Sequence, residues 1–306
     1  MQSSDMKRRL LAGSATMLGL LLSGCGGGGG VASAPPPTYT KLADLKGNQS
    51  FQSADIQYKN VYGSGTLSEH AGDAFGSGVH ISYTAADDSY TLTAPDGATT
   101  SFSPSTSTPP CCAVPTPNMA SLFTGADVYS RTTPIVNGVT LSYILLGDWS
   151  HTIQPGVSRN YVFVAGIPTI SSDMPKNGTA TYQTSIDGSA ETYNGLSYRL
   201  ASASTASFSA NFSAGTVSTT LDLTGVVPGN PNLTPFGKYS GTGTISSGGS
   251  GFTGTLTQDV PTNPATTGAF SGAFFGPQAK EVGYAWFVTN PALGGLRAQG
   301  YVIGVK

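Results

Sequence analysis

Alternation of apolar and polar residues in the second half of the chain is the feature that most restricts its fold. A period of two predicts β-strands with one buried face. Residues 205–213 and 215–224 are therefore predicted to be antiparallel strands joined at Ala214-Gly215. The apolar members of this pattern are Ala206, Phe208, Ala210, Phe212, Val217, Leu221 and Leu223.

The same reading continues to the C-terminus and gives eight candidate strands. Most gaps between them suit antiparallel neighbours, with longer loops at 187–204 and 225–237. Eight strands is about the number at which a closed barrel is filled by its own side chains or holds one small ligand. The sequence thus predicts an all-β protein in which residues 176–306 form an eight-stranded antiparallel β-barrel. Its expected strands are 178–186, 205–213, 215–224, 238–246, 251–258, 267–275, 281–288 and 297–305.

Residues 39–175 are predicted to form a separate, irregular β domain. A Pro/Ser/Thr-rich loop at 101–118 interrupts it, and loops of this length inside a domain are functional or mobile. No convincing amphipathic helix is present. The clearer strands expected in this half are 78–84, 89–94, 99–102, 139–146 and 159–164.

The N-terminus has the organisation of a secretory signal. Lys7, Arg8 and Arg9 precede an apolar segment that ends at Leu22 and is too short to span a bilayer. The next residues, up to Cys25, resemble the lipobox of bacterial lipoproteins, which implies cleavage after residue 24 and a diacylglycerol on the Cys25 thiol. The alternative is an ordinary signal peptide with an incidental cysteine.

Residues 25–38 are predicted to be a lipidated Gly/Pro linker, flexible at first and then stiff. Gly26 stands where enteric lipoproteins retained at the inner membrane have aspartate, so we expect an outer-membrane lipid anchor. Charged residues make up 10% of the chain, against the usual quarter. Signal cleavage removes three of the 14 basic and one of the 16 acidic residues, leaving a net charge of about −4. This charge makes nucleic acid an unfavourable partner.

One glycine-rich segment carries a family resemblance. Residues 268–288 follow the pattern G-x-F-x-G-x-F-x-G-P-x-A-x-E, and this resembles the barrel signature of transferrin-binding-protein-B-like surface lipoproteins. Residues 90–105 and 165–183 add to the similarity, which covers most of 40–306. The matching positions are Gly268, Phe270, Gly272, Phe274, Gly276, Pro277, Ala279 and Glu281. The residues after Glu281 depart from the pattern, because only one glycine of the usual pair is present, at Gly283.

The resemblance implies a handle-like first domain, a barrel, and capture of an iron source or another nutrient that is passed to a receptor in the same membrane. It also implies a surface-export translocon as a partner, and binding by loops of the first domain. The chain has one handle and one barrel, whereas transferrin binders have two lobes, which places transferrin itself in doubt. A host-interaction or adhesion lipoprotein without nutrient cargo is the alternative, and a structural coat lipoprotein is a third.

Gly276, Pro277, Ala279 and Glu281 are interpreted as structural. Gly276-Pro277 can end one strand, the next residues can form a tight turn, and Glu281 can accept backbone hydrogen bonds as the following strand begins.

Enzyme motifs are absent from the sequence. It contains no G-x-S-x-G elbow, H-E-x-x-H helix or Walker-type loop. The G-x-G-x-x-G at 249–254 lies between β runs with no helix after it. The chain is therefore predicted to bind rather than catalyse.

Three histidines, His70, His80 and His151, lack metal-ligand spacing, so no metal site is predicted. Ordinary surface or hydrogen-bonded histidines are the default interpretation. No cofactor is required, but haem is a candidate ligand because some relatives capture it. His151, beside Trp149 in an expected loop, is then the first choice for an axial ligand.

Cys111 and Cys112 are adjacent in the 101–118 loop. Neighbouring Cα atoms lie about 3.8 Å apart, which makes a disulfide between them a strained ring. The options are this vicinal disulfide, an intermolecular bridge or two exposed thiols. The vicinal ring is favoured as a means of stiffening the loop.

Overall fold

The computed structural model describes residues 37–61, 66–108, 119–193, 195–260 and 265–306. Its N-terminal part begins with a four-stranded antiparallel sheet in the order β1-β4-β5-β6. The short 3₁₀ helix η1 (Leu42–Asp44) precedes it. The strands are β1 (Gln49–Phe51), β4 (His80–Thr84), β5 (Ser89–Thr93) and β6 (Thr99–Phe102).

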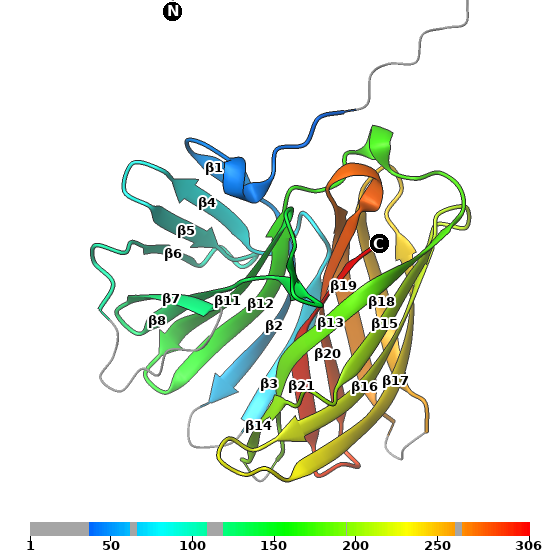
Figure 1. Ribbon diagram of the computed structural model, residues 1–306. Coiled ribbons are helices and arrows are strands. Elements are labelled where there is room, and N and C mark those ends of the chain that lie inside the picture. Colours follow the sequence, from blue (N-terminus) through cyan, green and yellow to red (C-terminus); the bar gives the residue numbers. More distant parts are fainter. Residues whose placement is uncertain (1–36, 62–65, 109–118, 194, 261–264) are drawn as a thin grey trace, which may run out of the picture. The chain divides into compact units, whose positions relative to one another are not determined.

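A second sheet, also antiparallel, has the order β3-β2-β12-β11-β8-β7 (Figure 1). The small hairpin β9 (Ile135–Val136) and β10 (Val139–Thr140) follows β8, and its turn residues Asn137 and Gly138 both have positive φ, as a type I′ turn requires. The strands of the sheet are β2 (Ser53–Val61), β3 (Thr66–Asp73), β7 (Met119–Thr124), β8 (Asp127–Thr132), β11 (Ile144–Gln154) and β12 (Val157–Gly166).

The two N-terminal sheets share one apolar core. Apolar residues of the first sheet, such as Ile81 and Leu92, are fully buried together with Tyr129 and Phe163 of the second. Burial of such side chains contributes about 1.5–3 kcal/mol each. This shared core holds β6 against β8 and β11, where His151 lies.

The C-terminal part is a closed barrel. In the described residues eight long strands pair with their neighbours in sequence, and β13 pairs with β21 to close the ring. The short β14 (Ser197–Leu200) adds to the sheet between β13 and β16. The long strands are β13 (Thr179–Glu191), β15 (Thr205–Asn211), β16 (Thr216–Val226), β17 (Leu233–Ile245), β18 (Gly251–Gln258), β19 (Thr267–Phe275), β20 (Glu281–Asn290) and β21 (Leu296–Val305).

The predicted barrel is therefore confirmed, with differences at two loops. Segment 187–204 is not a simple loop, because β13 extends to Glu191 and β14 forms within it. Segment 225–237 is shorter than expected, because β17 begins at Leu233. Pro235 and Gly237 hid this strand start in the sequence, and the ladder accommodates them with a bulge at Leu223/Thr224.

The first half departs further from the sequence prediction. The expected strand at 139–146 is divided between β10 and β11. Strands β2, β3, β7 and β8 were not predicted, because polar residues such as those of Thr66–Asp73 interrupt the alternation. These strands form because neighbouring strands supply their hydrogen-bond partners.

A third cluster of buried residues joins both halves of the chain. Ile144, Val162 and Val164 pack with Phe275 and Ile303 of the barrel. Residues 36–306 form one compact unit, and the division into domains 39–175 and 176–306 stays a prediction. No helix in the described ranges is both long and apolar enough to cross a membrane.

Candidate functional site

His151 and Trp149 lie on β11, not in the loop that the sequence predicted. They are two residues apart, so both side chains are on the same face of the strand, with ring centroids 5.4 Å apart. The loop prediction was wrong because Gly147, Asp148 and Ser150 obscured the alternation. Their neighbours β8 and β12 complete the ladder on both sides.

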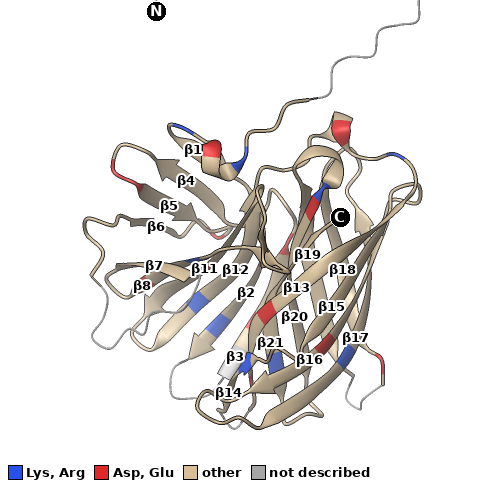
Figure 2. Ribbon diagram, in the orientation of Figure 1, with Lys and Arg blue, Asp and Glu red and all other residues tan. Residues whose placement is uncertain are grey.

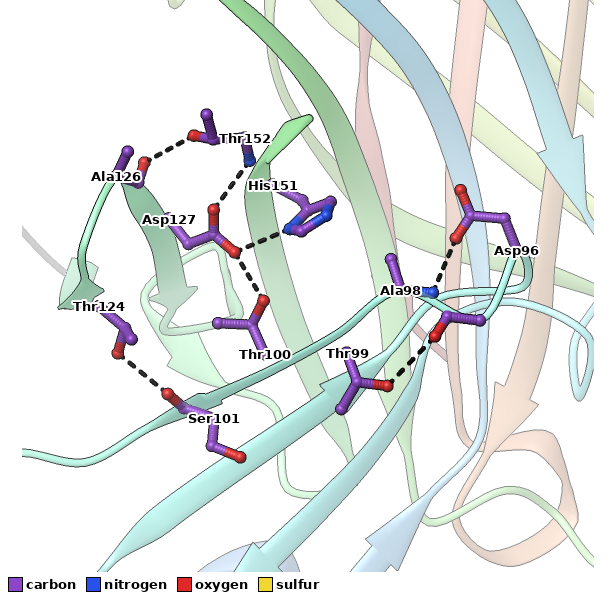
Figure 3. Close-up of polar contacts among 11 residues, drawn as sticks. Asp96, Ala98, Thr99, Thr100, Ser101, Thr124, Ala126, Asp127, His151 and Thr152 are labelled. Atoms are coloured by element: carbon purple, nitrogen blue, oxygen red, sulfur yellow. Dashed lines mark hydrogen bonds and ion pairs between the residues drawn. The ribbon is translucent and has the colours of Figure 1, made fainter. Parts of the chain in front are cut away.

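Asp127 fixes the orientation of His151 (Figure 3). Its Oδ2 lies 2.8 Å from Nδ1 of His151 and accepts a 2.6 Å hydrogen bond from Oγ1 of Thr100, and its Oδ1 accepts one from the backbone N–H of Thr152 at 2.8 Å. Burial raises the pKa of Asp127, but these hydrogen bonds outweigh it and hold the pKa below its usual range. The ionised carboxylate can only accept hydrogen bonds, so Nδ1 of His151 carries a proton, and in the neutral form of the ring Nε2 has the lone pair.

Trp149 packs against the ring of His151 on the inner side of the site. It is 1% exposed and stacks on Tyr161 at 5.0 Å. The side chain of His151 is 25% exposed. His151 is therefore the member of the pair that reaches the surface, and direct ligand contact by Trp149 stays a prediction.

The other two histidines differ from each other. His80 is exposed and its Nε2 lies 2.8 Å from Oγ of Ser50, in agreement with the default interpretation. His70 does not agree with it, because the ring is sandwiched between Tyr58 and Phe287 and its Nε2 is buried without a hydrogen-bond partner among the described residues. Since these neighbours are distant in sequence, no local signal marked His70.

Side chains fill the barrel interior. Phe252, Phe274 and Tyr284 are completely buried; each contacts Phe208, and Phe252 contacts the other two, with ring centroids 5.2–6.2 Å apart. Packing of this kind leaves the interior as a core rather than a ligand chamber.

The glycine-rich motif connects the barrel to the N-terminal part. β19 ends just before Gly276-Pro277, the turn η3 (Pro277–Ala279) closes with a hydrogen bond from Lys280 N–H to the Pro277 carbonyl, and β20 begins at Glu281. The carboxylate of Glu281 accepts the backbone N–H groups of Ser142 at 2.8 Å and Tyr143 at 2.9 Å. Burial raises the pKa of Glu281, although both donors act in the opposite direction. These residues have a structural part in the fold.

Cys25, Cys111 and Cys112 lie outside the described residues. The lipid anchor and the vicinal disulfide stay predictions. In the ranges that the structure describes, no group of three or more His, Cys, Asp or Glu side chains could hold a metal ion.

Asp148 is a second titratable group on β11, on the opposite face of the strand from Trp149 and His151. Burial, and then the negative charge of Asp187 on β13, raise the pKa of Asp148 to about 7. A carboxyl with a raised pKa binds its proton more tightly in the folded state, so its stabilising contribution is fully present below about pH 4 and is lost as the pH rises through about 7. We expect the free energy of unfolding to fall by about 2–4 kcal/mol between pH 4 and 8 from this group.

Asp148→Asn tests this expectation, because the amide cannot ionise. Denaturant unfolding of the wild type and the variant at pH 4 to 8 should give curves that diverge as the pH rises, with the variant less sensitive. Asp55 contributes a dependence of the same sign in both proteins, since burial and the charge of Asp73 raise its pKa. Parallel curves for the two proteins would contradict the prediction.

Comparison with known proteins gives one family match. Residues 174–305 match the family model described as C-lobe and N-lobe beta barrels of Tf-binding protein B. The C-terminal part is thus a transferrin-binding-protein-B-like barrel domain, as the glycine-rich motif indicated. A search of curated proteins finds no match.

Several solved structures are similar at low identity. Transferrin Binding Protein B from Haemophilus parasuis Hp5 is 19% identical, with 86% of this chain and 45% of that chain covered and a TM-score of 0.43. The isotype 1 protein from serogroup B Neisseria meningitidis is 18% identical over 83% and 43%, with a TM-score of 0.42. The N-lobe domain of Lactoferrin Binding Protein B of Moraxella bovis is 12% identical over 59% and 80%, with a TM-score of 0.33. The chain spans less than half the length of the two transferrin-binding proteins.

Proposed function

Because residues 174–305 form a barrel domain like those of transferrin-binding protein B, we propose that the chain is a lipoprotein of the outer membrane, anchored at Cys25 and displayed on the cell surface. It captures a nutrient ligand and passes it to a membrane receptor, without catalysis. Residues 39–175 act as the binding handle and residues 176–306 as the barrel, which a surface-export translocon recognises.

The observation that carries the binding part of this proposal is the oriented imidazole of His151. Its Nδ1 is held by Asp127, and its Nε2 is left with a lone pair at a partly exposed position. A histidine held by a carboxylate in this way has a fixed tautomer and increased basicity towards a metal. The filled barrel interior leaves no ligand chamber inside the barrel.

Haem is the cargo that fits this group best. Its iron takes an imidazole nitrogen as an axial ligand, and its porphyrin needs an apolar contact. Ile153 is an exposed apolar side chain close to His151 in sequence: it is 48% exposed and lies two residues further along β11, where the register with β12 shifts.

A protein ligand without nutrient cargo is the second candidate. The similar solved proteins are named for binding transferrin and lactoferrin. The handle exposes the apolar side chains Ile153 and Val139, at 48% and 59%, which a protein partner could cover.

Titration of the full chain with haemin tests the first candidate. We expect the wild type to develop a shifted Soret band, His151→Ala to lose it, and Asp127→Asn to bind haem about 10- to 100-fold more weakly because the imidazole is no longer oriented. His80→Ala is the matched control and should bind as the wild type does. A wild type without a Soret shift, or a His151→Ala variant that retains it, would refute haem capture at this site and favour the protein ligand.

A further inference from the structure

Two adjoining hollows lie at the barrel end that carries the turn after β13 and the turn between β20 and β21, the lower end in Figure 1. Their volumes are about 470 and 620 Å³, which is within the range of small-molecule sites. Pro291, Gly295 and Arg297 line both hollows. Arg297 therefore lies at the junction of the two hollows, where a ligand that occupies both hollows can contact it.

Arg297 has one acidic neighbour on the barrel. Glu191 faces it across the β13–β21 ladder, and the charge of Arg297 opposes the rise that burial causes in the pKa of Glu191. None of the ion pairs between described residues includes Arg297. Glu69, the acidic residue that lines the first hollow, is paired with Lys59 and Arg159 at 3.1 Å each. Few other charges are present on the barrel strands (Figure 2). Within the described residues Arg297 is thus outside any ion pair, so its guanidinium can bind an anion.

The wall of the first hollow is aromatic. His70 stacks between Tyr58 and Phe287, with centroid distances of 5.5 and 5.4 Å. Burial lowers the pKa of His70 to about 4, and the charge of Arg297 acts in the same direction, although Gln299 opposes them. The imidazole is therefore uncharged at neutral pH, and Phe287, which covers one of its faces, lines the hollow beside it.

The second hollow offers a further aromatic ring on a fixed backbone. Tyr193 is 70% exposed, but its backbone N–H donates to the Gly294 carbonyl at 2.9 Å. A Cβ added to Gly295 would lie 2.9 Å from Cβ of Tyr193, so the two turns are closely packed. Tyrosine has few rotatable bonds, so an exposed tyrosine ring on a fixed backbone loses little conformational entropy when it binds a ligand.

We propose that this end of the barrel binds a planar aromatic carboxylate. The guanidinium of Arg297 receives the carboxylate through two parallel hydrogen bonds, and the rings of Phe287 and Tyr193 contact the aromatic body by offset or edge-to-face stacking. This site is separate from His151 and does not rest on the proposed capture of haem.

Isothermal titration calorimetry with 2-naphthoate tests the proposal on the full chain carrying Cys25→Ser, which keeps the protein free of lipid. We expect 2-naphthoate to bind, and the uncharged 2-naphthylmethanol to bind about 10-fold more weakly or worse, because only the carboxylate pairs with Arg297. Arg297→Gln should lower the affinity for 2-naphthoate by about the same factor. Lys238→Gln, which removes an exposed cation that lines neither hollow, should leave the affinity unchanged.

Two further variants test the site even if Arg297→Gln does not fold correctly. Arg297→Lys keeps the positive charge but loses the forked geometry, so the affinity should fall between those of the wild type and Arg297→Gln. Tyr193→Ala alters an exposed side chain and should weaken binding of both naphthyl compounds. Absence of 2-naphthoate binding, or equal affinities in the wild type and Arg297→Gln, would overturn the proposal, whatever the result of the haemin titration.

Discussion

Glu281→Ala is expected to lower the free energy of unfolding by about 3–5 kcal/mol, because it removes two charge-assisted hydrogen bonds and leaves two backbone donors without an acceptor. Glu281 is 3% exposed, and its donors, Ser142 and Tyr143, belong to the segment between β10 and β11. Solvent therefore has little access with which to replace the carboxylate.

Urea denaturation followed by intrinsic fluorescence measures this change. Glu281→Gln retains one acceptor oxygen without the charge, and we expect an intermediate loss. Asp222→Ala is the matched control, since Asp222 is an exposed carboxylate on β16, and exposed substitutions of this kind stay within about 0.5 kcal/mol. If Glu281→Ala changes the free energy of unfolding as little as the control does, the carboxylate does not stabilise the contact between β20 and the segment before β11.

Gly276→Ala is expected to lower the free energy of unfolding by about 3–5 kcal/mol, for two reasons. Gly276 has φ 68° and ψ −170°, a region that only glycine adopts readily, and strain there is worth about 1–3 kcal/mol. In addition, a Cβ at this position would lie 2.4 Å from Cδ2 of the Tyr143 ring. Tyr143 cannot move away freely, because its backbone N–H is bonded to Glu281.

A second glycine variant separates the backbone strain from the contact with Tyr143. Gly215 has φ 65°, and a Cβ there would meet no atom within 4 Å, so Gly215→Ala should cost only about 1–2 kcal/mol from the backbone. Removing the Tyr143 ring in the background Tyr143→Ala should also reduce the cost of Gly276→Ala, as residues in contact are not additive. Equal costs for the two glycine variants, measured by the same urea titration, would count against the Tyr143 contact.

The barrel was predictable because its information is local. In Thr216–Val226 the buried and exposed positions alternate along the strand, and such a period of two can be read from adjacent residues without knowledge of their partners. The short polar β14 has no such period. It forms because β13 and β16 offer hydrogen-bonding edges to it, which the sequence of Ser197–Leu200 does not record.

The candidate sites depended on contacts between distant residues. His151 could be selected by residue type, but Asp127, 24 positions earlier, becomes its partner only because β8 and β11 pair. Likewise, Tyr58 and Phe287 enclose His70 from two different sheets.

By itself the sequence determined the all-β class, the strands of the barrel, the tight turn at Gly276-Pro277 and the need of Glu281 for backbone donors. Only the tertiary structure decided that those donors are Ser142 and Tyr143, that Asp127 orients His151, and that Arg297 lies between two hollows. The physical reason is that a strand's period and a turn's backbone conformation are properties of adjacent residues. The partner of a buried charge or ring is set instead by strand register and sheet packing, which arise from the whole chain at once.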